Sequence, residues 1–188
     1  MPIFQLGELF CGPGGLSYGA MTADIGDQNC RIVHAWATDY DRDSCQTYAH
    51  NICRGKPGSV ILKDVRELDL TTLGPIDALA FGFPCNDYSV VGERKGEAGE
   101  YGPLYTYGVK ALKLFRPQWF LAENVGGLKS ANEGKTFEKI LRELEEAGYT
   151  ITPHLYKFEE YGVPQTRHRI IIVGIRKDLG LKFRVPSP

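Results

Sequence analysis

Short apolar runs bounded by turn residues alternate with amphipathic stretches along most of the 188-residue chain. Seven runs have the length and composition of buried strands: 3–10, 31–39, 59–64, 76–83, 118–125, 149–158 and 168–176. Helical spacing occupies four of the intervals between them: 15–25, 42–53, 104–115 and 136–149. This alternation predicts an α/β fold, a mostly parallel Rossmann-like sheet with helices on both faces. The last two runs have no helix between them, which predicts an antiparallel hairpin at one edge.

The composition favours one compact domain over residues 1–188, because 43% hydrophobic residues can form one sizeable core. No stretch resembles a signal peptide or has the length of a membrane span, so we expect a soluble, intracellular protein that is cytoplasmic in a bacterium. The five cysteines contain no C-x-x-C pair, and we expect free thiols rather than disulfides or a metal site. The partly basic second half is compatible with a phosphate-rich partner, but the net charge of -1 lacks the strongly basic character of an independent nucleic-acid binder.

Chemically distinctive residues follow five of the predicted strands. In chain order they are the turn Cys11-Gly12-Pro13-Gly14-Gly15, then Asp39, Asp64, the pair Pro84-Cys85 and the pair Glu123-Asn124. Ligands of open α/β sheets bind beyond the carboxyl ends of the parallel strands. We therefore expect these residues to converge on one rim of the sheet.

The first three of these features indicate a nucleoside-bearing cofactor when they are taken together. The glycine turn lacks the full G-x-G-x-x-G spacing, and by itself an ordinary tight turn explains it equally well. Asp39 lies where a Rossmann-type site places an acid on the ribose hydroxyls. Asp64 lies one strand further along and could accept a hydrogen bond from an adenine amino group, although alone it would more often be a surface acid.

Cys85 has the setting of a presented thiol. An inert, buried role is the commonest fate of an intracellular cysteine. Here, however, Pro84 ends the strand, and the polar residues Asn86, Asp87 and Ser89 follow. A cysteine protease would also need a histidine base, and none of the four histidines lies in a recognisable partner motif.

Two further features carry charge at strand ends. Glu123 follows the apolar run "QWFLA", so its carboxyl group needs a partner or a function, and a structural salt bridge is as good an explanation as catalysis. In "QTRHRIIIVG", the period of two places Arg167 and Arg169 on one face of the strand and His168 on the other. Such a pair can hold a planar acceptor, or it can belong to a solvated edge strand.

In this order, these stretches resemble the DNA (cytosine-5) methyltransferase family. "ELFCGPGGLS", "TDY", "KDV", "GFPCNDYS", "AENV" and "YGVPQTRHRIIIVG" are similar to its cofactor and catalytic motifs. The resemblance covers nearly the whole chain and implies a seven-stranded Rossmann-like sheet with an antiparallel hairpin. It also implies that S-adenosyl-L-methionine, with no metal, binds at Phe10, Cys11, Gly12, Pro13, Gly14, Gly15, Asp39, Tyr40, Asp64, Val65, Pro84 and Leu104.

The resemblance further implies a covalent mechanism on cytosine. Cys85 attacks C6, Glu123 engages N3 and the amino group, Arg169 holds O2 and Arg167 supports the acid. Supporting roles are implied for Ser89, Asn124 and Gln165. The base must leave the DNA duplex for this chemistry, so DNA is the expected partner. The glycine-rich stretch 90–102 is expected to act as a mobile flap over the thiol.

The chain departs from the family's pattern at its end, "RVPSP", where family members continue into a target recognition domain and a final helix. We therefore expect weak cofactor binding and poor methylation by this chain alone, and a second chain could supply the DNA-reading part. Alternatives remain open: a tRNA cytosine-5 methyltransferase, a silent partner-binding module and, less favoured, a nicotinamide dehydrogenase.

Overall fold

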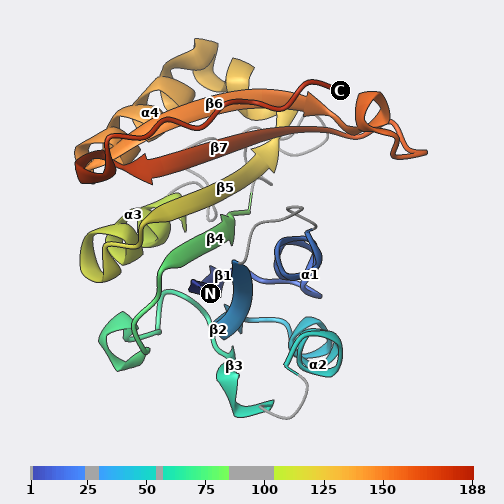
Figure 1. Cartoon of the computed structure of the whole chain (residues 1–188), viewed down its shortest axis with the longest axis vertical. Helices are drawn as coiled ribbons and strands as arrows, with labels where there is room; N and C mark the ends of the chain where they lie inside the picture. Colours follow the sequence, from blue (N-terminus) through green and yellow to red (C-terminus); the bar gives the residue numbers. More distant parts are fainter. Residues whose placement is uncertain (1, 24–29, 54–56, 85–103) are drawn as a thin grey trace.

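The computed structural model describes residues 2–23, 30–53, 57–84 and 104–188. Within these ranges the chain forms one sheet with the strand order β3-β2-β1-β4-β5-β7-β6 (Figure 1). The strands are β1 (Ile3–Leu9), β2 (Arg31–Asp39), β3 (Val60–Leu62), β4 (Ala78–Gly82), β5 (Trp119–Val125), β6 (Tyr149–Lys157) and β7 (His168–Arg176). All seven predicted strands are confirmed, and the predicted ends differ from the observed ends by a few residues.

The first five strands are mutually parallel, whereas β7 runs antiparallel to both of its neighbours. The predicted hairpin is therefore confirmed as β6 and β7. The sequence did not reveal that β7 lies between β5 and β6. The crossover through α4 (Lys135–Glu146) carries β6 to the outer edge, and β7 then turns back into the space beside β5.

Helices cover the sheet on both sides, as predicted. α1 (Gly15–Thr22) and α2 (Arg42–Asn51) lie on one face beside β1 to β3, and α3 (Tyr105–Phe115) and α4 lie on the other (Figure 1). The α4 helix ends before Gly148, whose φ of 100° is a conformation that glycine adopts without steric cost. None of the helices in the described ranges is both long and apolar enough to cross a membrane.

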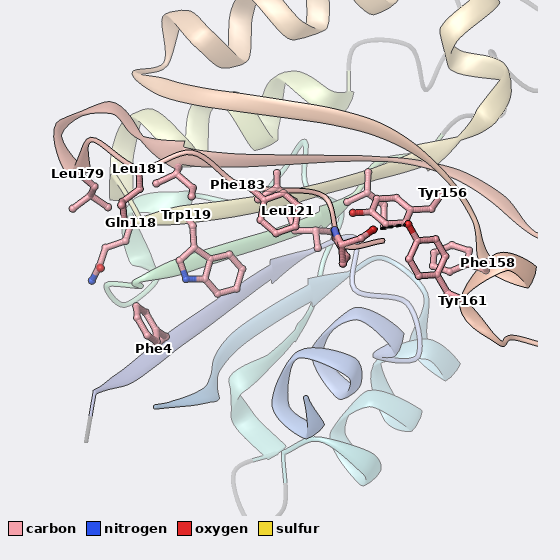
Figure 2. A pocket seen from close by; sticks show the side chains of 14 residues that line it. Phe4, Gln118, Trp119, Leu121, Tyr156, Phe158, Tyr161, Leu179, Leu181 and Phe183 are labelled. Atoms are coloured by element: carbon pink, nitrogen blue, oxygen red, sulfur yellow. Dashed lines mark hydrogen bonds between the residues drawn. The ribbon is translucent and has the colours of Figure 1, made fainter. Parts of the chain in front are cut away.

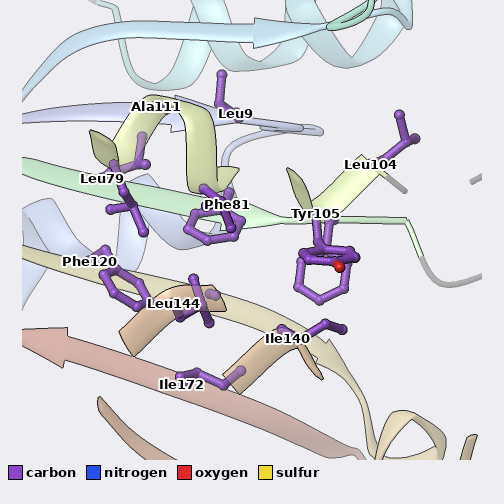
Figure 3. Packing of buried hydrophobic residues seen from close by; sticks show 14 of the residues in the cluster. Leu9, Leu79, Phe81, Leu104, Tyr105, Ala111, Phe120, Ile140, Leu144 and Ile172 are labelled. Carbon is purple, nitrogen blue, oxygen red and sulfur yellow. The ribbon is translucent and has the colours of Figure 1, made fainter. Parts of the chain in front are cut away.

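The main core lies between the sheet and the pair α3 and α4. Alternate residues of β5 point into it, and the Phe120 ring packs 5.9 Å from that of Phe81 and 5.1 Å from that of Tyr149 (Figure 3). Ile140 and Leu144 of α4 pack against this layer (Figure 3). The buried alternation fixes which face each residue of β5 occupies, so the odd-numbered residues, Glu123 among them, face the other side.

The opposite face of β5 and β7 is apolar and hollowed. A cavity of about 560 Å³ lies there, lined by side chains that include Phe4, Trp119, Leu121, Val173 and Leu181 (Figure 2). The chain beyond β7 crosses this face, where its backbone accepts hydrogen bonds at Phe183 and Pro186. This cavity contains none of the residues predicted to form the functional site.

Packing across the sheet predicts the effect of one glycine substitution. A Cβ atom at Gly174 of β7 would collide with the Phe120 ring, so we expect Gly174→Ala to lower the free energy of unfolding by about 1–3 kcal/mol. Gly19 of α1 is exposed and has no neighbour within 4 Å of such an atom, so Gly19→Ala is the control and should leave stability unchanged or slightly raised. Urea unfolding followed by circular dichroism measures both, and equal effects would contradict this packing.

Candidate functional site

The carboxyl ends of β1, β2 and β3 and the residues after β4 surround a cavity of about 170 Å³. Seven of the twelve residues predicted to bind a cofactor line it: Phe10, Asp39, Tyr40, Asp64, Val65, Pro84 and Leu104. Thr38, Lys63 and Arg66 complete the lining, and the sequence analysis did not single them out. The other five predicted residues, Cys11 to Gly15, form the adjoining turn. The structure thus brings this set together at one rim, and what it binds stays a prediction.

The glycine turn is held in shape by Asp39. One oxygen of its carboxylate accepts a hydrogen bond from the Gly12 amide at 2.8 Å, and the other accepts from the Asp41 amide at 2.9 Å. Phe10 has a positive φ of 55°, which is rare outside glycine and marks backbone strain at the edge of the cavity. Asp39 therefore braces the turn, and its remaining lone pairs can still accept from a ligand.

Gly14 has a steric reason to be glycine. Its φ is 98°, and a Cβ atom there would lie 2.9 Å from the ring of Tyr48. The turn therefore rests directly on a buried aromatic side chain of α2. Because α1 begins at the next residue, Gly15, the first amide groups of that helix point toward the same rim.

Asp64 has a partner that the sequence did not reveal. Arg66 donates hydrogen bonds to both carboxylate oxygens of Asp64, from Nη2 to Oδ2 at 2.6 Å and from Nε to Oδ1 at 3.0 Å. These hydrogen bonds lower the pKa of the Asp64 carboxyl group. Asp64 therefore stays ionised and remains an acceptor at the cavity wall, although a ligand would have to share it with Arg66.

Glu123 lies between the two predicted arginines. Its Oε1 atom is 2.9 Å from Nε of Arg169 and 3.7 Å from Nη2 of Arg167. All three side chains are partly exposed, so the carboxylate is accessible as well as paired. His168 points to the opposite side, where it pairs with Glu159 at 2.6 Å. The predicted alternation along β7 is confirmed.

Asn124 connects this ion pair to the end of β4. Its side chain is buried, and Nδ2 donates to the carbonyl oxygen of Phe83 at 3.1 Å. Glu123 itself pairs with Gly82 across the parallel strands, and its Oε2 atom faces that glycine. The segment that leads into Pro84 is therefore fixed against β5. Cys85, Ser89 and the predicted flap 90–102 lie outside the described residues, and Gln165 is exposed in the segment before β7.

The sequence analysis missed a buried carboxyl group next to the turn. Glu8, the penultimate residue of β1, is 1% exposed and accepts hydrogen bonds from the hydroxyl groups of Ser17 and Tyr48. Burial is the largest of the causes that raise its pKa, to about 7. An acid at the end of an apolar run was the signal that identified Glu123, and the same signal in "IFQLGELF" would have identified Glu8.

The part of the chain that the structure describes holds no cluster of three or more histidine, cysteine or acidic side chains placed to bind a metal ion. The carboxylates at the rim are instead paired with backbone amides or arginines. The arrangement suits a ligand with apolar, hydroxyl and amino groups. Such a ligand would meet the apolar walls at Phe10, Val65 and Leu104 and the acceptors at Asp39 and Asp64.

Comparisons with known proteins agree with this geometry. Residues 4–188 match the family described as C-5 cytosine-specific DNA methylase. The chain is 60% identical over 196 residues to the type II methyltransferase M.BbvI of Brevibacillus brevis, covering 98% of this chain and 52% of that protein. It is 37% identical to M.NgoFVII of Neisseria gonorrhoeae, with 96% and 46% of the two chains covered. The chain thus spans about half the length of the curated relatives it matches.

Solved structures show the same fold. A prophage-encoded DNA modification methyltransferase of Escherichia coli superposes with a TM-score of 0.73 at 26% identity, over 96% of this chain and 49% of that one. The Dnmt2 methyltransferase of S. pombe superposes with a TM-score of 0.71 at 19% identity, over 97% and 53% of the two chains. At this identity, the second match supports the fold alone.

The support of the turn by Tyr48 yields a direct test. Gly14→Ala forces a β-carbon into a left-handed conformation and against that ring, so we expect the free energy of unfolding to fall by about 2 kcal/mol. Gly15→Ala is the matched control, because nothing lies within 4 Å of a Cβ atom there. Chemical denaturation of both variants gives the comparison. If Gly14→Ala is as stable as Gly15→Ala, the turn does not rest on Tyr48 as described.

Proposed function

Because this chain belongs to the C-5 cytosine-specific DNA methylase family, we propose that it transfers a methyl group from S-adenosylmethionine to C5 of cytosine in DNA. One observation supports this most strongly. Pro84 lines the candidate cofactor cavity. The carbonyl oxygen of the preceding residue, Phe83, accepts a hydrogen bond from Asn124, the neighbour of Glu123. The cavity and the Glu123–Arg169 pair are therefore attached to the same short segment, the one that leads into Cys85.

The cavity residues fit the proposed cofactor. Asp39 would accept from ribose hydroxyls, Asp64 from the adenine amino group, and Phe10 and Val65 would contact the adenine ring. Bound S-adenosylmethionine would supply a methyl group that its sulfonium makes electrophilic. The glycine turn and the start of α1 would hold the amino-acid end of the cofactor.

Cys85 is the proposed nucleophile, because C5 of cytosine is too poor in electrons to take a methyl group unaided. Its thiolate would form a bond to C6, and the electron pair of the C5–C6 double bond would shift toward C4 and N3. The resulting enamine is nucleophilic at C5. After methylation, loss of the C5 proton to a base would restore the double bond and expel the thiolate. The bond that formed to sulfur is thus broken again, and the enzyme is regenerated.

Glu123 and its arginines would offset the charge that develops during this addition. A carboxyl group that shares a proton with N3 stabilises the ring when sulfur adds. Arg169 at 2.9 Å and Arg167 at 3.7 Å orient that carboxyl group, and Arg169 has further N–H donors for the cytosine O2. The target base would have to be flipped out of the duplex to reach this site.

We also propose that methylation of double-stranded DNA needs a DNA-reading part equivalent to the remaining half of the curated relatives. A second polypeptide could supply that part. Cofactor binding is expected to persist in the 188-residue chain but to be weak. Rapid methylation of duplex DNA by this chain with no other polypeptide added would contradict the requirement.

Replacement of the proposed nucleophile tests the reaction. Cys85→Ala is expected to reduce methyl transfer to cytosine at least about 10³-fold, because no covalent step remains. The assay should supply the DNA-reading part and compare duplex DNA, single-stranded DNA, which needs no base flipping, and tRNA side by side, with the modified base identified by mass spectrometry. Undiminished transfer by the variant would contradict the mechanism. Transfer to tRNA alone would favour the RNA-modifying alternative.

Removal of the arginine partner tests the proposed role of Glu123. Arg169→Ala is expected to lower the methylation rate by about 10²-fold or more, because the carboxyl group loses its partner at 2.9 Å and O2 loses a donor. Arg184→Ala removes the same charge from an exposed position near the end of the chain and serves as the control. Equal rates in the two variants would mean that Arg169 has only a structural role.

A further inference from the structure

We propose that Glu8 is a positioning residue for the glycine turn, and that its buried carboxyl group keeps the turn in the shape that adjoins the candidate cofactor cavity. The identity of the ligand rests on the proposed function. The position of the turn does not, because it follows from contacts within the chain.

The carboxyl group of Glu8 joins three elements behind the turn. It leaves β1 one residue before the strand ends and accepts from both the hydroxyl and the backbone amide of Ser17, in the first turn of α1. The single hydroxyl proton of Tyr48 in α2 is shared between this carboxyl group at 3.2 Å and the Ser17 hydroxyl at 2.7 Å. All three side chains are fully or almost fully buried.

The turn rests on this group of side chains. Gly14, the residue before α1, fits against the Tyr48 ring with no room for a Cβ atom, and its amide donates to the Cys11 carbonyl at 3.1 Å. Its carbonyl accepts from the Tyr18 amide at 2.8 Å, so the turn and the first turn of α1 move together. A shift of Ser17 or Tyr48 would therefore displace the turn.

Ionisation of Glu8 would change this arrangement near neutral pH. A protonated carboxyl group can donate as well as accept, whereas a carboxylate can only accept, so the Ser17 and Tyr48 hydroxyls would have to reorient. Burial raises the pKa of Glu8 to about 7, and the nearby Asp39 carboxylate also raises it, while the two hydroxyl groups lower it. Two other titratable groups of the described chain face this cluster. They are the Cys11 thiol and the His34 ring of β2, whose Nδ1 atom lies 3.2 Å from the Tyr48 hydroxyl.

The sign of the pH effect follows from these values. The folded-state pKa of Glu8 lies above its ordinary value of 4.5, so the proton-bearing form favours the folded chain. The stabilisation is fully present below pH 4.5 and is lost as the pH rises toward about 7. At higher pH the folded chain carries a buried carboxylate, and the turn it supports is the segment that should respond.

Nuclear magnetic resonance of the ligand-free chain tests this without any cofactor. The amide signals of Gly12, Gly14 and Ser17 are expected to titrate together with a midpoint near 7 in the wild-type protein, and to be flat between pH 5.5 and pH 8.5 in Glu8→Gln. Glutamine keeps the shape of the side chain and cannot ionise. Absence of the midpoint, or the same midpoint in Glu8→Gln, would overturn the proposal and would assign any titration to another group such as His34.

A binding measurement connects the turn to the cavity. Glu8→Ala leaves the amide and the hydroxyl of Ser17 without their acceptor, and we expect it to weaken S-adenosylhomocysteine binding at pH 6 about 10-fold, whereas Glu8→Gln should retain the affinity. Leu144→Ala, in α4 on the far side of the sheet, is the control for lost stability and should bind normally.

The two failures are distinguishable. Unchanged affinity in Glu8→Ala would overturn the positioning role. No binding by the wild-type chain at any pH would contradict the proposed function, and the resonance titration would still decide the role of Glu8.

Discussion

Parallel pairing of β1, β4 and β5 is the constraint on which the rest of this structure depends. Its register sets Gly82 opposite Glu123, so the segment after β4 and the carboxyl group of β5 end side by side. The buried alternation of β5 turns Phe120 and Ala122 toward α3 and α4 and Glu123 away from them. A shift of one residue would bury the carboxyl group and expose the aromatic core, and that cost keeps the proposed catalytic groups in place.

The fold was largely predictable from the sequence because the pattern of apolar runs is strong and regular. The insertion of β7 between β5 and β6 was not, since local periodicity carries no information about which strands pair. At the site, strand-end position predicted Asp39, Asp64 and Pro84 of the cavity lining. The family resemblance supplied the apolar and aromatic residues of the lining, and Thr38, Lys63 and Arg66 were missed. The partners of the predicted residues, such as Arg66 on Asp64, depend on side-chain orientation, which spacing does not reveal.

Rigid support and polar chemistry are combined in the same short segments. Asp39 braces the glycine turn through Gly12 and also lines the cavity, and Asn124 holds the end of β4 while its neighbour Glu123 faces the arginines. Among the residues that the structure describes, Asp39 and Asn124 are thus held by backbone contacts and Glu123 by an ion pair. Glu8 adds a buried acid beneath the turn, and we propose that its proton affects the shape of the candidate cofactor site.

The proposed reaction requires a thiol, a carboxyl group and a methyl donor to meet at one rim of the sheet. A crystal structure of the chain with S-adenosylhomocysteine bound tests it most directly. We expect ligand density between Phe10, Asp39 and Val65, with the Cys85 sulfur on the same side of the sheet as the Glu123 carboxyl group. Density elsewhere, or a Cys85 sulfur that is buried in the core or turned away from Glu123, would contradict it.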